Sequence, residues 1–376
     1  MGTSKRISLS STDVGRSDEA LTWNHYAPAT HGMLRIDLDI ENEIITSARP
    51  ILGSMHRGAE KLFESRDYRQ VLGLANRHEW LSAFSGEVGV ATLVERELGI
   101  DIPQSARWLR TLLLETFRIT SHLAFLSSYP WRDDALANEL RIEREKIVNL
   151  IRGYTGSRMH PMLTQIGGLT HAPSRRWLVN LAELMQTLQE SIALQSERSW
   201  NELALLKGIG KLSAAEISKH AVSGPVARAS GVAIDIRQKS DWLMYSALES
   251  FSSPTHEDGD IPARIQQLFD EVKSSCRMAA ELAEATQQFE NSEVNVLTPK
   301  VLRVPEGEYQ HSIETPLGIA QWLLISKGDK YPYRLALRPA SLHTILALSP
   351  ALVGENEQHL QAIVGSMPFI TGDADR

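Results

Sequence analysis

The sequence predicts an α+β fold that is mostly helical, with a central bundle of long helices and small β elements near both ends of the chain. Long stretches in its middle repeat apolar residues every three or four positions, as helices packed in a bundle do. Near residues 33–50 and 309–334, apolar and polar residues alternate instead, which is typical of strands. Strands confined to the two ends of a helical chain favour small sheets packed on a bundle.

The first predicted β element is a hairpin. Apolar and charged residues alternate from Met33 to Ile40, a polar turn follows at Glu41–Asn42, and a second apolar run continues to Pro50. The segment before it, residues 1–22, is rich in Ser, Thr, Asp and Arg and has no apolar stretch of the kind found in secretory signals. We expect this segment to be a disordered lead-in.

Helices are expected through the middle of the chain and strands after it. The predicted helical segments are 68–98, 104–127, 174–200, 263–289, 340–348 and 356–367. Pro103 suits the start of the second segment, and Ser174 is a suitable N-cap for the third. Strands are predicted within residues 309–334, with a turn at Lys327–Gly328.

A chain of 376 residues could hold two or three domains, but no internal repeat or low-complexity linker divides it. We therefore expect a single domain over residues 23–376. Within it, residues 23–58 form the β-hairpin region, 59–300 the helical bundle and 301–376 a C-terminal α+β portion.

Composition excludes several classes of function. The net charge of −7 and the pI near 6.0 do not predict a nucleic-acid-binding surface, which would need a basic face. A single cysteine, Cys276, excludes a disulfide framework and any thiolate cluster built from this chain alone. No run of eighteen apolar residues predicts a transmembrane helix, so we expect a cytoplasmic protein that meets a membrane only through partners.

One candidate functional residue stands in a loop. His31, within Pro28–Gly32, lies just before the first predicted strand, where loops on a rigid scaffold often carry function. An imidazole there can exchange a proton near neutral pH. A turn histidine that bonds its own backbone is the commoner outcome for this feature taken alone.

Three further clusters of charge follow. His56–Leu62 groups His, Arg, Glu and Lys around a glycine, and by itself is best interpreted as a solvated helix start. Arg158–His160 could direct two cationic donors at an anion or simply close a helix. Ser223–Arg237 contains glycine and proline that impose special backbone shapes, and offers charged side chains for an ion-pair network. No metal-site spacing, Ser-His-Asp triad, P-loop or dinucleotide fingerprint occurs, so this chain should not bind NADH itself.

Taken together and in order, these segments resemble the D-type subunit of bacterial complex I, the NADH-quinone oxidoreductase. The similar runs are PATHGMLRIDLDIENE, GSMHRGAEKLFESRDYRQ, NRHEWLSAFSGEVGVATLVERELGI, ARWLRTLLLETFRITSHL, IEREKIVNLIRGYTGSRMH, IGGL, VSGPVARASGVAIDIR, PYRLAL and the terminal GDADR. The resemblance extends from about Pro28 to the last residue. That family is related to the large subunits of nickel–iron hydrogenases, which need two C-x-x-C pairs to hold their metals. One cysteine cannot supply four thiolates, so we expect no metal in this chain.

The resemblance implies a quinone site shared with a partner. In the family, the quinone headgroup enters a cavity beside the partner's terminal iron–sulfur cluster, and the loop histidine, here His31, hydrogen-bonds a quinone carbonyl. Thr30, Gly32 and Trp80 correspond to other quinone-binding positions, with His31 and Trp80 as the catalytic pair. A donor at the carbonyl stabilises the charge that develops as electrons arrive.

Other roles carry over by motif. Arg57 and His160 correspond to groups close to the partner's cluster, where positive charge raises the cluster potential. A structural ion-pair network is expected to include Glu60, Glu115, Arg118, Arg228, Asp235 and Arg237.

The implied assembly is a complex on the cytoplasmic side of the cell membrane. Its expected partners are an iron–sulfur subunit of B type, a subunit of C type and a membrane-arm subunit that forms the quinone channel. The chain is expected to bind no cofactor of its own, with quinone as substrate, NADH or ferredoxin as electron donor, and no activity in isolation.

The sequence departs from the family where protons would be supplied. Trp80 stands where the family has a tyrosine, and an indole cannot act as a proton source. Ala27 replaces an earlier histidine of the loop, and Gln165 replaces an arginine. The acidic partner of the loop histidine falls on Arg132, with Asp133 one residue later. We therefore also consider a non-catalytic scaffold or assembly paralogue that has lost the proton-donor half of the site.

Overall fold

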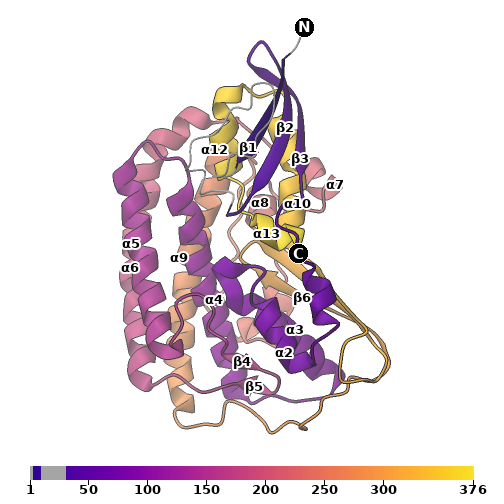
Figure 1. The fold of residues 1–376 in the computed structure, drawn as a ribbon. Coiled ribbons are helices and arrows are strands. Elements are labelled where there is room, and N and C mark those ends of the chain that lie inside the picture. The colour runs from indigo at the N-terminus through magenta and orange to yellow at the C-terminus, as the bar shows by residue number, and fades with distance from the viewer. Residues whose placement is uncertain (1–2, 10–30) are drawn as a thin grey trace.

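A computed structural model of the protein describes residues 3–9 and 31–376. Four long helices lie side by side and form the predicted bundle, and a three-stranded sheet stands at one end of the molecule (Figure 1). The bundle helices are α4 (Gln104–Ser128), α5 (Asp134–Thr155), α6 (Arg175–Leu203) and α9 (Ile261–Thr286). Helix α9 packs against both α4 and α6, and α5 packs against the same two helices. The α+β class expected from the sequence is confirmed.

The apolar stripes predicted for the bundle are buried. In α6 the stripe residues at three- and four-residue spacing are Leu178, Leu181, Met185, Leu188 and Ile192. Ser174 caps this helix, because its Oγ accepts a hydrogen bond from the backbone N–H of Trp177 at 3.3 Å. Helix α4 begins directly after Pro103, as its position before the stripe predicts.

The N-terminal β element is larger than the predicted hairpin. Strands β2 (Leu34–Glu41) and β3 (Ile44–Ile51) form that hairpin, and β1 (Thr3–Leu9) pairs antiparallel with the other edge of β2. The prediction of a disordered lead-in over residues 1–22 was therefore wrong for Thr3–Leu9, and residues 10–22 lie outside the described part of the chain. The physical reason is that the free edge of β2 offers unpaired backbone groups, which a distant segment can satisfy.

The helical segment predicted over residues 68–98 divides into two helices. α2 (Tyr68–Ala75) and α3 (Ala83–Glu97) are joined by tight turns that include a 3₁₀ helix at Trp80–Ser82. In this corner, the N–H of Trp80 donates to the carbonyl of His78 at 3.0 Å. The corner turns Glu79 into the protein, where its side chain is buried.

The C-terminal portion combines a second sheet with short helices. Strands β6 (Gly307–Thr315), β7 (Gly318–Ser326) and β8 (Arg334–Arg338) are antiparallel in sequence order. The helices after them are α10 (Ala340–Leu346), α11 (Leu348–Leu352), α12 (Leu360–Gly365) and α13 (Thr371–Asp375). The remaining short elements are α1 (Ala59–Phe63), β4 (Thr164–Gln165), β5 (Gly168–Leu169), α7 (Ala214–Lys219) and α8 (Pro225–Arg228).

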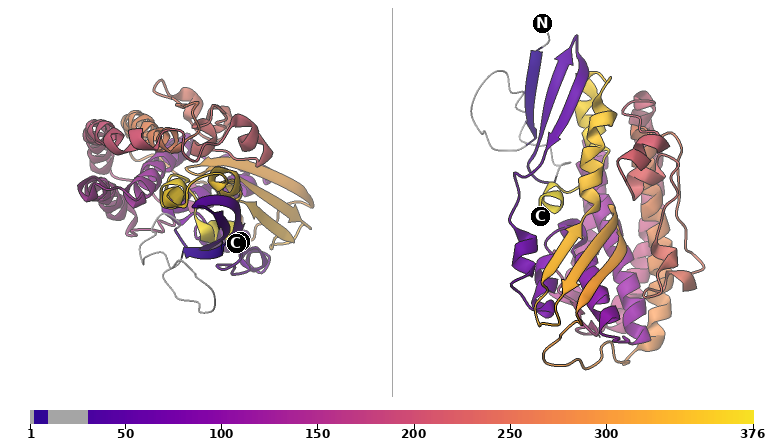
Figure 2. Two further views of the ribbon diagram at one scale, coloured as in Figure 1. Left: turned by 90° about the horizontal axis from the view of Figure 1, so that it is seen from above. Right: turned by 90° about the vertical axis from the view of Figure 1, so that its right-hand side faces the viewer.

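The C-terminus ends inside the molecule rather than at its edge. Helix α13 lies between the β1–β2–β3 sheet and the lower body that contains α2 and α3 (Figures 1 and 2). Its residues 371–375 are all buried. Across the described ranges, we find no helix with the length and apolar character needed to span a membrane.

Candidate functional site: the junction around the C-terminal helix

His31 lies at the junction between the N-terminal sheet and the bundle. Its backbone is left-handed, with φ of 42°, and its ring meets Phe125 of α4 edge-on with the ring centroids 4.6 Å apart. The Nε2 atom of His31 is buried and has no hydrogen-bond partner among the described residues. A buried polar atom without a partner costs about 1–3 kcal/mol, so this nitrogen is suited to meet a ligand.

His31 is uncharged near neutral pH. Burial, and after it the positive charge of Arg144, lowers the pKa of His31 to about 4. The imidazole can therefore hydrogen-bond a carbonyl but does not hold an extra proton at pH 7.

The acidic partner sought for His31 is not found among the described residues. The backbone N–H of Arg132 donates to Glu202 at 2.9 Å, and Asp133 caps α5 and pairs with Arg198. Within the described ranges, neither residue has a hydrogen bond or ion pair with His31. The correspondence of Arg132 to the family's acidic position therefore stays a prediction.

Trp80 and the His31 loop both contact helix α13. A Cβ added at Gly372 would lie 2.6 Å from Cζ3 of Trp80, so only glycine lets the indole ring approach this closely. A Cβ at Gly32 would lie 2.5 Å from Sδ of Met55 and 3.0 Å from Cβ of Thr371. Trp80 and Gly32, the chain neighbour of His31, are therefore brought to one short helix.

Helix α13 is held in place by its own last residues. The two carboxylate oxygens of Asp375 accept hydrogen bonds from the backbone N–H groups of Gly53 and Met55, each at 2.7 Å. Arg376 pairs with Glu60 at 3.3 Å. The terminal GDADR motif, one of the runs that carry the family resemblance, is thus part of the junction itself, a role that sequence reasoning missed.

Two buried carboxyl groups flank this contact. Glu79 precedes Trp80 and Asp373 follows Gly372, and their exposed fractions are 7% and 2%. Burial, and then the charge of Asp373, raises the pKa of Glu79 well above its ordinary value. Burial raises the pKa of Asp373 to about 7. The sequence does not predict that these carboxyl groups are buried together, because Arg77–His78–Glu79 has the polarity of an exposed turn.

Arg57 and His160 both lie against the end of α2, which we call the Arg57–His160 corner. The guanidinium of the exposed Arg57 donates to the carbonyl of Arg77 at 3.5 Å. Burial, and then the charge of Arg77, lowers the pKa of His160, which also has a backbone hydrogen bond with Asn76. Two residues more than a hundred positions apart in the sequence therefore both contact the end of α2.

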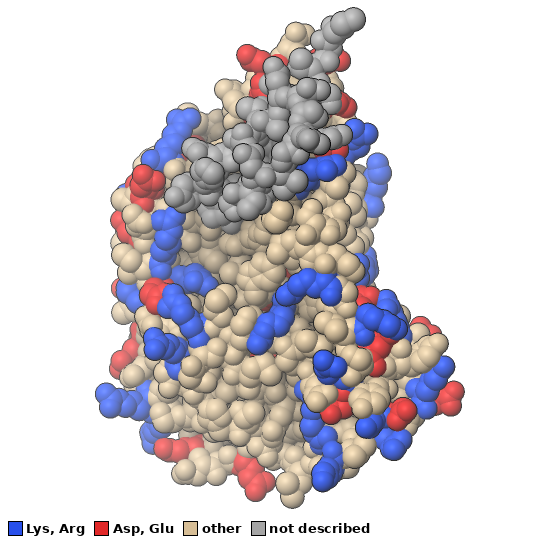
Figure 3. All heavy atoms as spheres, viewed as in Figure 1, with Lys and Arg blue, Asp and Glu red and all other residues tan. Residues whose placement is uncertain are grey.

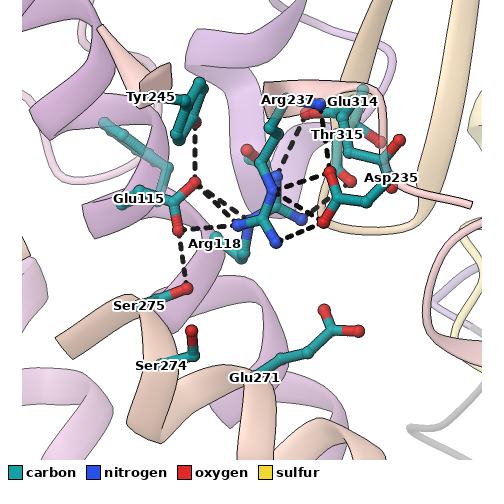
Figure 4. A network of polar contacts seen from close by, with 12 residues as sticks. Glu115, Arg118, Asp235, Arg237, Tyr245, Glu271, Ser274, Ser275, Glu314 and Thr315 are labelled. Carbon is teal, nitrogen blue, oxygen red and sulfur yellow. Dashed lines mark hydrogen bonds and ion pairs between the residues drawn. The ribbon is translucent and has the colours of Figure 1, made fainter. Parts of the chain in front are cut away.

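The expected ion-pair network exists and is buried (Figure 4). Its members are Glu115, Arg118, Arg228, Asp235, Arg237, Glu271 and Glu314. Arg237 lies between Glu115 and Asp235, with N–O distances of 3.1 and 2.6 Å. Although burial opposes ionisation, Arg237 and then Arg118 hold the pKa of Glu115 at about 2. His122, whose Nε2–H donates to the carboxylate of Glu271 at 2.9 Å, belongs to the same network.

The remaining predicted residues lie elsewhere. Glu60 is not in this network but binds Arg334, Arg376 and the N–H of Leu337. Thr30 lies outside the described residues. Gln165, which replaces a family arginine, accepts through its carbonyl from Arg110 at 3.1 Å, so another arginine occupies this region.

The described residues contain no group of three or more His, Cys, Asp or Glu side chains arranged to hold a metal ion. The thiol of Cys276 is buried in α9, where burial raises its pKa. On the face seen in Figure 3, Lys and Arg side chains border a broad area that carries no charged side chains. Such a surface suits contact with other proteins better than a self-contained catalytic pocket.

Comparisons with known proteins show the family to which the chain belongs. Residues 140–376 match the family of the respiratory-chain NADH dehydrogenase 49 Kd subunit. The chain is 41% identical to the D 1 subunit of NADH-quinone oxidoreductase from Streptomyces coelicolor, with 96% of each chain covered. It is 35% identical to the D subunit of NADH-quinone oxidoreductase from Dehalococcoides mccartyi, with 93% of this chain and 96% of the other covered.

A solved structure has the same fold. It is that of the membrane-bound sulfane sulfur reductase, an archaeal respiratory membrane complex, and one of its chains superimposes with a TM-score of 0.83 at 26% identity. The match covers 93% of this chain and 96% of that one.

Proposed function

Because the chain belongs to the D-type subunit family of NADH-quinone oxidoreductases, we propose that its α13 junction is the site where quinone is reduced beside a partner's iron–sulfur cluster. The observation that carries the proposal is the buried, unpartnered Nε2 of His31. A quinone carbonyl would satisfy it, and the neutral imidazole would stabilise the charge that develops on that oxygen. The indole of Trp80 would hold the ring of the quinone by stacking.

The Arg57–His160 corner is proposed to face the cluster-bearing partner, which is of the B type. Both groups lie at the end of α2, and positive charge or N–H donors there would favour the reduced cluster. A partner of the C type and a membrane-arm subunit complete the proposed assembly, on the cytoplasmic side of the membrane. The electron donor would be NADH or ferredoxin.

The test uses the assembled complex, because the chain is proposed to be inactive alone. We expect quinone reductase activity in the natural complex and at least about a hundredfold loss in His31→Ala, since a pre-organised donor to a developing oxyanion contributes about 10²–10³. His311→Ala is the matched control. Burial also lowers the pKa of His311 to about 4, but His311 lies on β6, lining a different cavity.

A second function is favoured by one specific observation. His31 has no carboxylate partner among the described residues and Trp80 replaces the family's tyrosine, which suits a scaffold paralogue that no longer reduces quinone. A natural complex that assembles but neither binds nor reduces quinone would establish this alternative and refute the proposed reductase site.

A further inference from the structure

Quinone reduction consumes two protons. The two residues predicted to be catalytic, His31 and Trp80, cannot donate a proton at neutral pH. His31 is neutral because burial and Arg144 lower its pKa to about 4. The N–H of the Trp80 indole donates hydrogen bonds but does not ionise at any useful pH. A working site needs another group that carries a proton at neutral pH and lies beside Trp80.

Glu79 and Asp373 meet these requirements by position. Each is the chain neighbour of a residue in the Trp80–Gly372 contact, and that contact brings the 3₁₀ turn and α13 together. Asp373 accepts a hydrogen bond from the Ser341 hydroxyl at 2.7 Å. One carboxyl oxygen of Glu79, Oε1, is buried and has no hydrogen-bond partner among the described residues. Because an unpaired buried charge is costly, a carboxyl with such an oxygen is either protonated or needs a hydrogen-bond donor from a ligand or water.

We propose that Glu79 and Asp373 share one proton and deliver it to quinone at the Trp80 site. This inference rests on the proposed function. The quinone takes two electrons from the partner's iron–sulfur cluster, and its two C=O groups become two C–OH groups. One of the two protons leaves the carboxyl pair, which is then left as two carboxylates, and the other comes from water. A proton taken up from water restores the pair.

Burial of both carboxyls favours a retained proton, and the charge of Asp373 adds to this effect at Glu79, while Arg118 and Arg376 oppose it. Glu79 faces Asp373 and Arg118, together with the Thr315 hydroxyl and the N–H of Leu317. Asp373 faces Ser341 and Arg376. Arg118 is already engaged by Glu115 and by the carbonyls of residues 314 and 315, so it neutralises the pair only in part. Two carboxylates side by side in a buried site repel, and one proton between them relieves the repulsion.

A cavity lies at the C-terminal end of α13, directly after Asp373. The three residues that follow Asp373, namely Ala374, Asp375 and Arg376, line a cavity of about 700 Å³ that also includes His56 and Glu60. Helix α13 therefore has the Trp80 contact near its start and this cavity at its end.

The experiment measures quinone reduction against pH in the intact complex, for the natural chain, Asp373→Asn and Glu79→Gln. Removing a general acid typically costs about 10²–10⁴ in rate, so we expect kcat to fall at least about a hundredfold in either variant while KM changes little. In Asp373→Asn, the alkaline limb of the profile moves to lower pH, because Glu79 loses the neighbouring charge that raises its pKa. Asp373→Glu should restore both rate and profile.

A control variant and a spectroscopic measurement distinguish loss of a proton donor from structural damage. Asp260→Asn changes a buried carboxyl that caps α9 through Ala263 and Gly208, away from Trp80, and should leave the profile unchanged. Infrared spectra of the complex should contain a protonated-carboxyl band at neutral pH that both pair variants lose.

The outcomes are distinguishable. A natural pH profile and kcat in both pair variants would overturn the shared-proton proposal and leave the proposed function intact. A natural complex that reduces no quinone would overturn both. Loss of rate without any shift of the pH profile, and with the infrared band retained, would reduce Glu79 and Asp373 to a structural role and overturn the inference.

Discussion

Two groups of buried carboxylates lie on either side of Arg118, and they are ionised in opposite ways. On the bundle side, Glu115 is bound by Arg237, Arg118, Ser275 and Tyr245, and its pKa is held at about 2. On the α13 side, Arg118 near Glu79 and Arg376 near Asp373 oppose the effect of burial without overcoming it, and the pKa values of both carboxyls are raised. All three carboxyls are buried, so the close contacts of Glu115 with Arg237 and Arg118 account for its lowered pKa. Burial can still outweigh a single arginine, because the pKa of Glu314 is raised although Arg228 binds it at 2.9 Å.

This difference in ionisation implies different roles for the two groups of buried carboxyls. A carboxylate matched by arginine and fully hydrogen-bonded has no proton to lend and holds helices together. A carboxyl pair short of positive charge destabilises the fold at neutral pH, and in our proposal it stores a proton for the substrate.

The largest expected effect comes from removing an arginine from the buried ion-pair network. Arg228→Met would leave Glu271 and Glu314 without the guanidinium that binds them at 2.8 and 2.9 Å. Removing one partner of a buried ion pair costs about 3–5 kcal/mol, so thermal unfolding should move to much lower temperature or assembly should fail. Arg132→Met, at an exposed position, is the control and should change stability by less than about 0.5 kcal/mol.

Opposite pH responses provide the second test. The folded-state pKa of Glu115 is lowered from 4.5 to about 2, so its stabilisation is present above pH 4.5 and is lost as pH falls toward 2. The pKa of Asp373 is raised from 3.8 to about 7, so its carboxyl destabilises the fold increasingly as pH rises through that range. At pH 7, Glu115→Gln should unfold more easily than the natural chain and Asp373→Asn less easily, by denaturant titration. Equal shifts in one direction would contradict the comparison.

A smaller effect is expected from restoring a phenol. Trp80→Tyr introduces a group that can donate a proton, so in the Asp373→Asn background it should recover most of the lost quinone reductase rate. In the natural background it should change the rate by less than about tenfold, a small part of the typical general-acid contribution. A large gain from Trp80→Tyr alone would mean that the natural site lacks a proton donor.

The smallest effect concerns the corner at the end of α2. His160→Gln should lower the potential of the partner's cluster by no more than about 59 mV, which is a tenfold change for a one-electron couple. Redox titration of the assembled complex measures it. Arg175→Gln, at an exposed ion pair with Glu290 on the start of α6, is the control and should leave the potential unchanged.

What the sequence predicted well was local. Helical stripes, the Ser174 cap and the alternation of β2 follow from spacing along the chain, and the structure has them. The pairing of Thr3–Leu9 with β2 depends on an edge that another segment leaves open, so no local pattern predicts it.

Some residues of the candidate site could likewise be predicted from the sequence, and others could not. His31, Trp80, Arg57 and His160 could be named because their motifs match a family, and the structure brings them to one junction or its corner. The carboxyl pair could not be named, because burial of Glu79 depends on a 3₁₀ turn meeting a helix nearly three hundred residues later. Ionisation of a side chain is decided by such tertiary neighbours rather than by its own sequence context.

The most direct test of the central claim is the position of a quinone analogue bound to the intact complex, determined by structure. We predict that one carbonyl oxygen lies within hydrogen-bond distance of Nε2 of His31 and that the ring stacks on Trp80. An analogue bound elsewhere, with the His31 and Trp80 rings packed as they are here, would contradict the assignment of the α13 junction as the quinone site.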